Sequence, residues 1–214
     1  MSEALLRLAA HWSLDRLLYR VWRYNPRGLY RLYQHHRFDR ALNVDTRGYG
    51  DLRYEPTPAA AFTRILEFLD IDFARYTFID IGSGKGKALL LASAFPFRRM
   101  IGVERFPEFH RIAERNVAGF PRVELVCCDA VDYTFPEEPS VVYLFNPFGE
   151  DLLERIVKNL ECSLAKAPRS LFVVYYAPIL RRGSPWDRRR VFDSSPALRI
   201  RTDNRAFTVY QSSE

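Results

Sequence analysis

Short apolar runs alternate with amphipathic stretches over most of the chain. The runs have the length and composition of buried strands, and the stretches between them carry apolar residues at helical spacing. The runs are Tyr76–Ile81, Met100–Val103, Val123–Cys128, Val141–Phe145 and Ser170–Tyr176, and the helical stretches are Lys87–Ala94, Glu108–Ala118 and Asp151–Leu164. Strands that alternate with helices predict a doubly wound α/β fold, in which a mostly parallel sheet has helices on both faces.

The two ends of the chain depart from this alternation. Near the C-terminus, apolar runs over Leu198–Thr202 and Ala206–Gln211 flank a turn at Asp203–Asn204, which predicts an antiparallel hairpin that closes the sheet. Near the N-terminus, helices are expected over residues 4–24 and 28–39, followed by a loop over 43–58 and a helix over Ala59–Leu69. We therefore predict a helical N-terminal extension or lid over residues 1–53 and a main domain over 54–214. The first helix either packs on the main domain or lies on a membrane surface through Trp12 and Trp22.

Charge and composition narrow the class of protein. The 214 residues carry a net charge of +6, most of it from arginine. Residues 1–53 hold ten arginines against five acids, and residues 181–190 hold five against one. These basic flanks predict either an anionic partner or a solvated surface. No apolar run is long enough to cross a bilayer and no signal peptide is visible, so a cytoplasmic protein is expected. The three cysteines have no metal-ligand spacing; they are expected to be buried small side chains, and no metal site is predicted.

The strongest motif is a glycine-rich turn between a strand and a helix, FIDIGSGKGKALLLA at residues 78–92. Gly82, Gly84 and Gly86 allow a tight turn and let a ligand approach the backbone. Asp80 lies two residues before the first glycine. A carboxylate there would repel the diphosphate of a dinucleotide but would attract a cationic ligand such as S-adenosylmethionine (SAM), which carries an ammonium and a sulfonium. Asp80 could also hydrogen-bond the loop backbone, and the two roles are compatible.

Two further acids follow the next two apolar runs. Glu104 ends the run IGVE, 24 positions after Asp80, at a spacing that favours hydrogen bonds to ribose hydroxyls. Asp129 ends VELVCCD, where it would either accept a hydrogen bond from an adenine amino group or cap the segment that follows.

A polar motif follows the fourth apolar run, at the carboxyl edge where open α/β sheets bind ligands. The Asn146 amide oxygen and a free carbonyl at Pro147 could accept hydrogen bonds from an amine and aim its lone pair at the methyl group. Phe148 could stack against a flat substrate or shield the cation. The alternative is a plain Asn-Pro turn.

Taken together and in this order, these motifs resemble the class I SAM-dependent methyltransferases, a Rossmann-like superfamily with a seven-stranded sheet whose last strand is antiparallel. The resemblance covers residues 54–214 and is strongest over 76–149. It implies SAM as cofactor: the glycine loop with Asp80 and Ser83 holds the methionine part, and two further acids hold the ribose and the adenine. These acids are Glu104 and Asp129, and Thr57 of the YEPTP run completes the predicted cofactor-binding set.

The resemblance also suggests an acceptor atom. The YEPTP run with DIGSGKG is similar to seven-strand protein lysine methyltransferases, whereas Asn146-Pro147-Phe148 is similar to the motif of amino-directed methyltransferases, with one proline where that motif has two. Both imply transfer of a methyl group from SAM to a nitrogen, such as a protein lysine or another amine. The alternatives are an NAD-dependent oxidoreductase and a non-catalytic nucleic-acid-binding protein.

Overall fold

The computed structural model describes residues 36–46, 54–145, 149–178, 183, 187–204 and 206–213. The chain divides into two compact units, Met1–Ala59 and Ala60–Glu214. In the first unit, residues 36–42 are helical, and the buried Asp39 accepts hydrogen bonds from the backbone N–H (3.1 Å) and the hydroxyl of Thr46. The Tyr54 hydroxyl donates to the Thr46 carbonyl at 3.0 Å, which ties the following segment to this turn. The helix expected over residues 4–24 lies outside the described residues.

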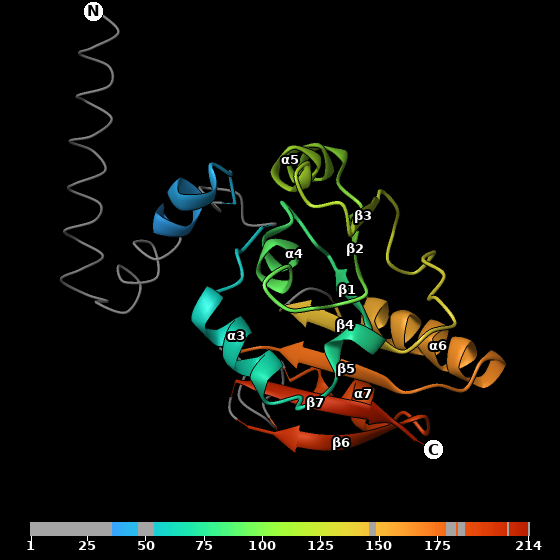
Figure 1. Ribbon diagram of the computed structural model, residues 1–214. Coiled ribbons are helices and arrows are strands. Elements are labelled where there is room, and N and C mark those ends of the chain that lie inside the picture. Colours follow the sequence, from blue (N-terminus) through green and yellow to red (C-terminus); the bar gives the residue numbers. More distant parts are fainter. Residues whose placement is uncertain are drawn as a thin grey trace, which may run out of the picture. The chain divides into compact units, whose positions relative to one another are not determined.

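The second unit is built on a seven-stranded sheet (Figure 1). Its strands are β1 (Thr77–Ile81), β2 (Arg99–Val103), β3 (Val123–Val126), β4 (Ser140–Phe145), β5 (Leu171–Tyr176), β6 (Leu198–Asp203) and β7 (Phe207–Ser212). Its helices are α3 (Ala59–Glu67), η1 (Phe73–Arg75), α4 (Lys87–Ala92), α5 (Pro107–Val117), α6 (Glu150–Lys166) and α7 (Arg189–Asp193). The five expected parallel strands and the C-terminal hairpin are therefore all confirmed.

The strand order is β3-β2-β1-β4-β5-β7-β6. The first five strands pair in parallel, whereas β7 lies antiparallel between β5 and β6. A sheet for dinucleotides usually runs 3-2-1-4-5-6, so the inserted antiparallel strand separates this topology from that one. Strands are added on one side of β1 as far as β3 and on its other side from β4 onward, and ligands bind at the carboxyl ends of the strands beside such a switch in strand order. The glycine loop follows β1 at this point.

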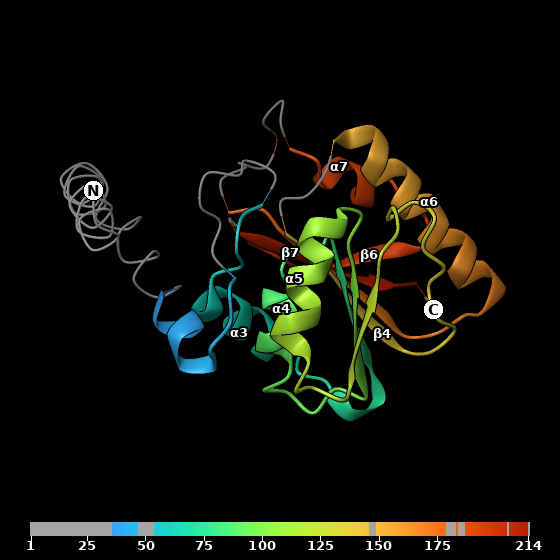
Figure 2. The ribbon, with the colours of Figure 1, turned by 90° about the horizontal axis from the view of Figure 1, so that it is seen from above.

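Helices cover both faces of the sheet (Figure 2). Alternate residues of each strand face opposite sides, and one set packs with the apolar stripes of α6 and α7 in a single buried core that includes Ile79, Val142 and Leu160. On the opposite face, Phe62 of α3 lies edge-on to Phe78 and Tyr143, with ring centroids 5.7 and 5.2 Å away. Asp80 belongs to this second face, where α4 and α5 also pack.

Two expectations about local structure are wrong. Strand β3 ends at Val126 rather than at Cys128, and Cys127 and Cys162 are exposed while Cys128 is half-buried. The reason is that β3 is the edge strand, and the chain leaves the sheet before the cysteines. The short helix α7 was not expected from the sequence, because its five residues include two arginines and resemble a solvated segment.

In the part of the chain that the structure describes, every helix is too short or too polar to pass through a bilayer.

Candidate cofactor site

The glycine loop is seated on β2 by its backbone. The N–H groups of Gly82 and Ser83 both donate to the carbonyl of Val103, each at 2.9 Å. Gly86, the residue before α4, has φ of +79°, a conformation that glycine adopts without steric cost. A Cβ on Gly86 would also lie 3.3 Å from the Cβ of Ala113, so the loop packs closely against α5. These contacts hold the loop at the carboxyl end of β1, as the motif predicts.

Gly102 of β2 is a second glycine on which the loop depends, and the sequence did not single it out. A Cβ at this position would lie 2.6 Å from Cδ1 of Leu89, 2.9 Å from Cδ2 of Leu125 and 2.9 Å from Oγ of Ser83. The space above Gly102 is therefore filled by α4, β3 and the glycine loop at once. The Ser83 hydroxyl is buried and has no hydrogen-bond partner within the described residues, so a bound ligand would find one polar group unsatisfied there.

Asp80 lies on β1, an inner strand of the sheet, and is in register with Gly102 of β2 on one side and Tyr143 of β4 on the other. Asp80 is only 4% exposed. Burial, and secondarily the negative charge of Glu104, raise the pKa of Asp80 from 3.8 to about 8. A buried acid that shares its surroundings with a second acid resists ionisation, because each negative charge lacks water and repels the other. A positive ligand would relieve both costs, and an anionic ligand would add to them.

Glu104 follows β2 and is 5% exposed. Its Oε2 accepts the N–H of Gly84 at 2.8 Å, and its Oε1 accepts the N–H of Phe106, also at 2.8 Å. The side chain thus ties the glycine loop to the segment that leads into α5. A carboxylate has about four acceptor positions, so roughly two remain for hydroxyl groups of a ligand. The predicted ribose role is compatible with this geometry, and Glu104 also has a structural role that the sequence did not reveal.

Asp129 follows β3, and its side chain caps the segment that follows, which is one of the two roles predicted for it. Its Oδ1 accepts the N–H of Val131 at 3.2 Å, and its carbonyl accepts the N–H of Asp132 at 3.0 Å. Its Oδ2 lies 3.6 Å from Nη1 of Arg105, which comes from the loop after β2. The side chain remains about a third exposed, at 32%, so it is accessible to a ligand at the sheet edge.

The other predicted site residues are those of the Asn-Pro-Phe motif and Thr57. Asn146, Pro147 and Phe148 lie outside the described residues. Just before them, Phe145 at the end of β4 stacks on Tyr176 at the end of β5, with ring centroids 5.0 Å apart. An aromatic pair therefore borders the place where the motif begins. Thr57 is buried and belongs to the first unit, and its cofactor role stays a prediction.

The donor and acceptor set at this edge fits SAM. The site offers a buried acid pair, a backbone turn of glycines and an accessible third acid, and it collects them at the carboxyl ends of three adjacent parallel strands. The acids match the hydroxyls and amines of a nucleoside and the two positive groups of a methionine sulfonium. They oppose a diphosphate, which needs donors and positive charge.

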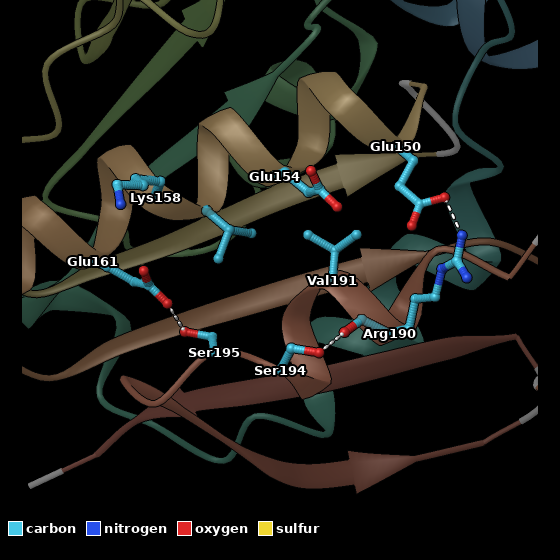
Figure 3. A pocket seen from close by; sticks show the side chains of 9 residues that line it. Glu150, Glu154, Lys158, Glu161, Arg190, Val191, Ser194 and Ser195 are labelled. Carbon is cyan, nitrogen blue, oxygen red and sulfur yellow. Dashed lines mark hydrogen bonds and ion pairs between the residues drawn. The ribbon is translucent and has the colours of Figure 1, made fainter.

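A groove of about 360 Å³ lies elsewhere, between α6 and α7 (Figure 3). Most of the residues that line it are charged or polar, with two valines among them. Three contacts cross or line it: Arg190 with Glu150, Ser195 with Glu161 at 2.5 Å, and the Ser194 hydroxyl with the Arg190 carbonyl at 2.8 Å. The helices that form it cover the face of the sheet opposite to Asp80. This groove is therefore separate from the glycine-loop site.

In the described part of the basic run over residues 181–190, Arg189 is buried, Arg188 is half-buried and Arg190 is exposed. Arg189 is 1% exposed; it pairs with Asp187 at 3.0 Å and donates to Oγ1 of Thr208 at 3.0 Å. Arg190 and Arg188 both approach Glu150, the latter at 3.9 Å. These three arginines neutralise acids of the same chain, which weakens the prediction of an anionic partner at this flank.

Comparisons with known proteins agree with the topology. No family model matches the sequence, and no curated protein was found with a similar sequence. Solved structures match by fold. A candidate methyltransferase, yhhF from Escherichia coli, has a TM-score of 0.56 at 15% identity, over 76% of this chain and 89% of that one. The 23S rRNA methyltransferase ErmE has a TM-score of 0.54 at 17% identity, over 75% and 70% of the two chains.

A SAM-dependent methyltransferase from Aquifex aeolicus has a TM-score of 0.51 at 14% identity, over 71% of this chain and 88% of that one. The chain therefore has the fold of the class I SAM-dependent methyltransferases, as its motifs indicate. At these identities the likeness extends to the fold alone, and the residues of the site determine the reaction.

Proposed function

We propose that this protein is a SAM-dependent methyltransferase that acts on a nitrogen acceptor. The observation that carries the proposal is the buried pair of acids at the glycine loop, Asp80 and Glu104, in a sheet with an antiparallel seventh strand. A site that raises the pKa of its own carboxyl group is prepared for a ligand that brings positive charge. The structural neighbours support the choice of a methyltransferase, because they include a 23S rRNA methyltransferase and one methyltransferase described as SAM-dependent.

The chain's residues would divide the work as follows. Asp80 and the glycine loop hold the methionine part, Glu104 accepts from the ribose hydroxyls, and Asp129 accepts from the adenine amino group. SAM supplies a methyl group that is already activated by its sulfonium. The protein therefore mainly has to align the acceptor with that methyl group and exclude water. A neutral amine needs no strong general base.

The acceptor would be presented by Asn146, Pro147 and Phe148. The Asn146 amide oxygen and a neighbouring backbone carbonyl accept hydrogen bonds from an amine and so direct its lone pair. Phe148 would shield the positive charge of the methyl donor, as the motif predicts. Acceptors of this chemistry include a protein lysine, a nucleobase amine and a small-molecule amine. Among these, a nucleic-acid acceptor is supported by one structural neighbour, a 23S rRNA methyltransferase, and the sequence motif adds lysine.

Calorimetry tests the cofactor. SAM and its demethylated product are expected to bind, and NAD is not; preferential binding of NAD would instead support an oxidoreductase. Labelling of fractionated cell extract with tritiated SAM tests the reaction and identifies the acceptor, since the label enters protein, nucleic acid, lipid or small molecules. Binding of nucleic acid that survives Asp80→Ala, without any methyl transfer, would instead support a non-catalytic binding protein.

The acceptor motif is tested separately. Asn146→Ala should leave SAM affinity nearly unchanged and lower turnover by about 100-fold, the usual scale for loss of a group that acts in the transition state. Asn146→Gln is the matched control, since it keeps the amide and changes only the reach of the side chain. An equal loss of cofactor binding and turnover would show that Asn146 is only structural.

A further inference from the structure

Arg105 lies between the two acids that would hold the nucleoside. It follows Glu104 directly, in the segment after β2, and its Nη1 is 3.6 Å from Oδ2 of Asp129, in the segment after β3. Strands β2 and β3 are parallel neighbours, with Val103 in register with Val126. Their carboxyl ends therefore open side by side, and the Arg105 side chain spans the gap between them.

The backbone that carries Arg105 is held in place on both sides. The N–H of Glu104 donates to the carbonyl of Val126 at 3.0 Å, and the N–H of Phe106 donates to the Glu104 carboxylate at 2.8 Å. The guanidinium itself is held loosely. Its side chain is 52% exposed, and its distance from Asp129 exceeds that of a hydrogen bond. An anchored backbone with a loosely paired side chain lets the guanidinium move within the gap.

The guanidinium already lies over an aromatic ring. Its Cζ is 5.0 Å from the centroid of Phe106, and Phe106 in turn contacts Phe109 edge-on with centroids 5.8 Å apart. A guanidinium is planar and stacks on flat π-systems, which a lysine ammonium does not do in the same way. A nucleoside base that enters the gap between Glu104 and Asp129 would present a second flat π-face to Arg105.

We infer that Arg105 is a specificity-determining residue for the cofactor: its guanidinium covers one face of the purine ring while it stays close to Asp129. The inference rests on the proposed function, because Glu104 and Asp129 define where the base lies. In this arrangement Asp129 keeps a free acceptor position for the exocyclic amine, since Oδ1 already binds Val131 and Oδ2 is not hydrogen-bonded by Arg105. Arg105 also balances part of the negative charge that the three acids bring to this edge.

The competing explanation is that Arg105 only clips β2 to β3 by occupying Asp129. The two explanations predict different changes in SAM affinity when the Arg105 side chain is removed. A residue that stacks on the base contributes to affinity, so its removal weakens binding. A residue that blocks Asp129 has to be displaced by the ligand, so its removal leaves affinity unchanged or strengthens it.

The test is calorimetric affinity of the full chain for SAM and S-adenosylhomocysteine, with thermal melting to verify that each variant is folded. Arg105→Ala is expected to weaken both ligands by about 2- to 30-fold, the range of a cation–π contact. Arg105→Lys should fall between the wild type and Arg105→Ala, because it keeps the charge and loses the planar group. Arg111→Ala is the matched control: Arg111 is exposed on α5, and among the described residues its side chain donates to its own helix, to the Pro107 carbonyl at 3.2 Å.

A ligand without a base separates stacking from charge. S-ribosylhomocysteine keeps the ribose and the amino-acid part, and Arg105→Ala should leave its affinity, measured by competition, unchanged. An equal loss for this ligand, or unchanged or tighter SAM binding by Arg105→Ala, would overturn the inference and leave the proposed function intact. Absence of SAM and S-adenosylhomocysteine binding in the wild type would overturn both.

Discussion

Asp80→Asn tests the electrostatic argument for the site, because it removes the ionisable group and nearly keeps its shape. Burial and the charge of Glu104 raise the pKa of Asp80 from 3.8 to about 8. Between these two pH values the folded chain holds a proton that the unfolded chain has lost. The free energy of unfolding therefore falls as the pH rises through this window. Asparagine has no such proton, so the variant should escape this loss.

The magnitude follows from the width of the window. Each pH unit inside it costs the wild type about 1.4 kcal/mol, so the stability of Asp80→Asn relative to the wild type should rise by about 3 kcal/mol between pH 5 and pH 7. Cofactor binding should change in the opposite sense. The ionised carboxylate attracts the cation, so the wild type should bind SAM more tightly as the pH approaches 8 and release a proton on binding at pH 7. Asp80→Asn should bind SAM weakly at every pH.

The assays are urea unfolding followed by circular dichroism at both pH values, and calorimetry in two buffers of different ionisation enthalpy, which counts protons released. Asp132→Asn, at an exposed carboxylate, controls for the loss of one charge. If the free energies of unfolding of the wild type and Asp80→Asn differ by the same amount at pH 5 and at pH 7, burial does not raise the pKa of Asp80. The site would then have no electrostatic preference for a cationic ligand.

Three other predictions follow from packing and burial. Gly102→Ala should destabilise the protein by about 1–3 kcal/mol and weaken SAM binding, because its Cβ would overlap Leu89 and the glycine loop; Gly119→Ala, in open space, should be nearly neutral, and equal effects in unfolding assays would refute the packing argument. Arg189→Met should lower the free energy of unfolding by about 3–5 kcal/mol, because it leaves Asp187 buried without its cationic partner. Protonation neutralises that acid, so the loss should shrink as the pH falls below 4, and a loss that is the same at every pH would contradict this explanation. Burial, and secondarily the charges of nearby acids, raise the pKa of Cys128, so in the native protein two thiols should react quickly with a disulfide reagent and one slowly, and three equal rates would show that Cys128 is not protected.

The sequence alone determined the parts of this protein that depend on local spacing. Apolar runs of strand length alternate with helical stretches, and this local pattern was enough to predict the parallel sheet and the C-terminal hairpin. The glycine loop and the acids at the ends of strands were visible for the same reason: each is set by its distance along the chain from the strand before it. Asp80, Glu104 and Asp129 all lie at the carboxyl edge that this spacing implies.

Only the tertiary structure decided the features that depend on residues far apart in sequence. The insertion of β7 between β5 and β6, the lack of space at Gly102 and the burial of Arg189 each require elements from distant segments to meet. The exposure of Cys127 follows from the position of β3 at the sheet edge, which an apolar run does not reveal. The physical reason is common to all four: burial and charge environment are properties of packed neighbours, and a strand's sequence carries its period but not its place in the sheet.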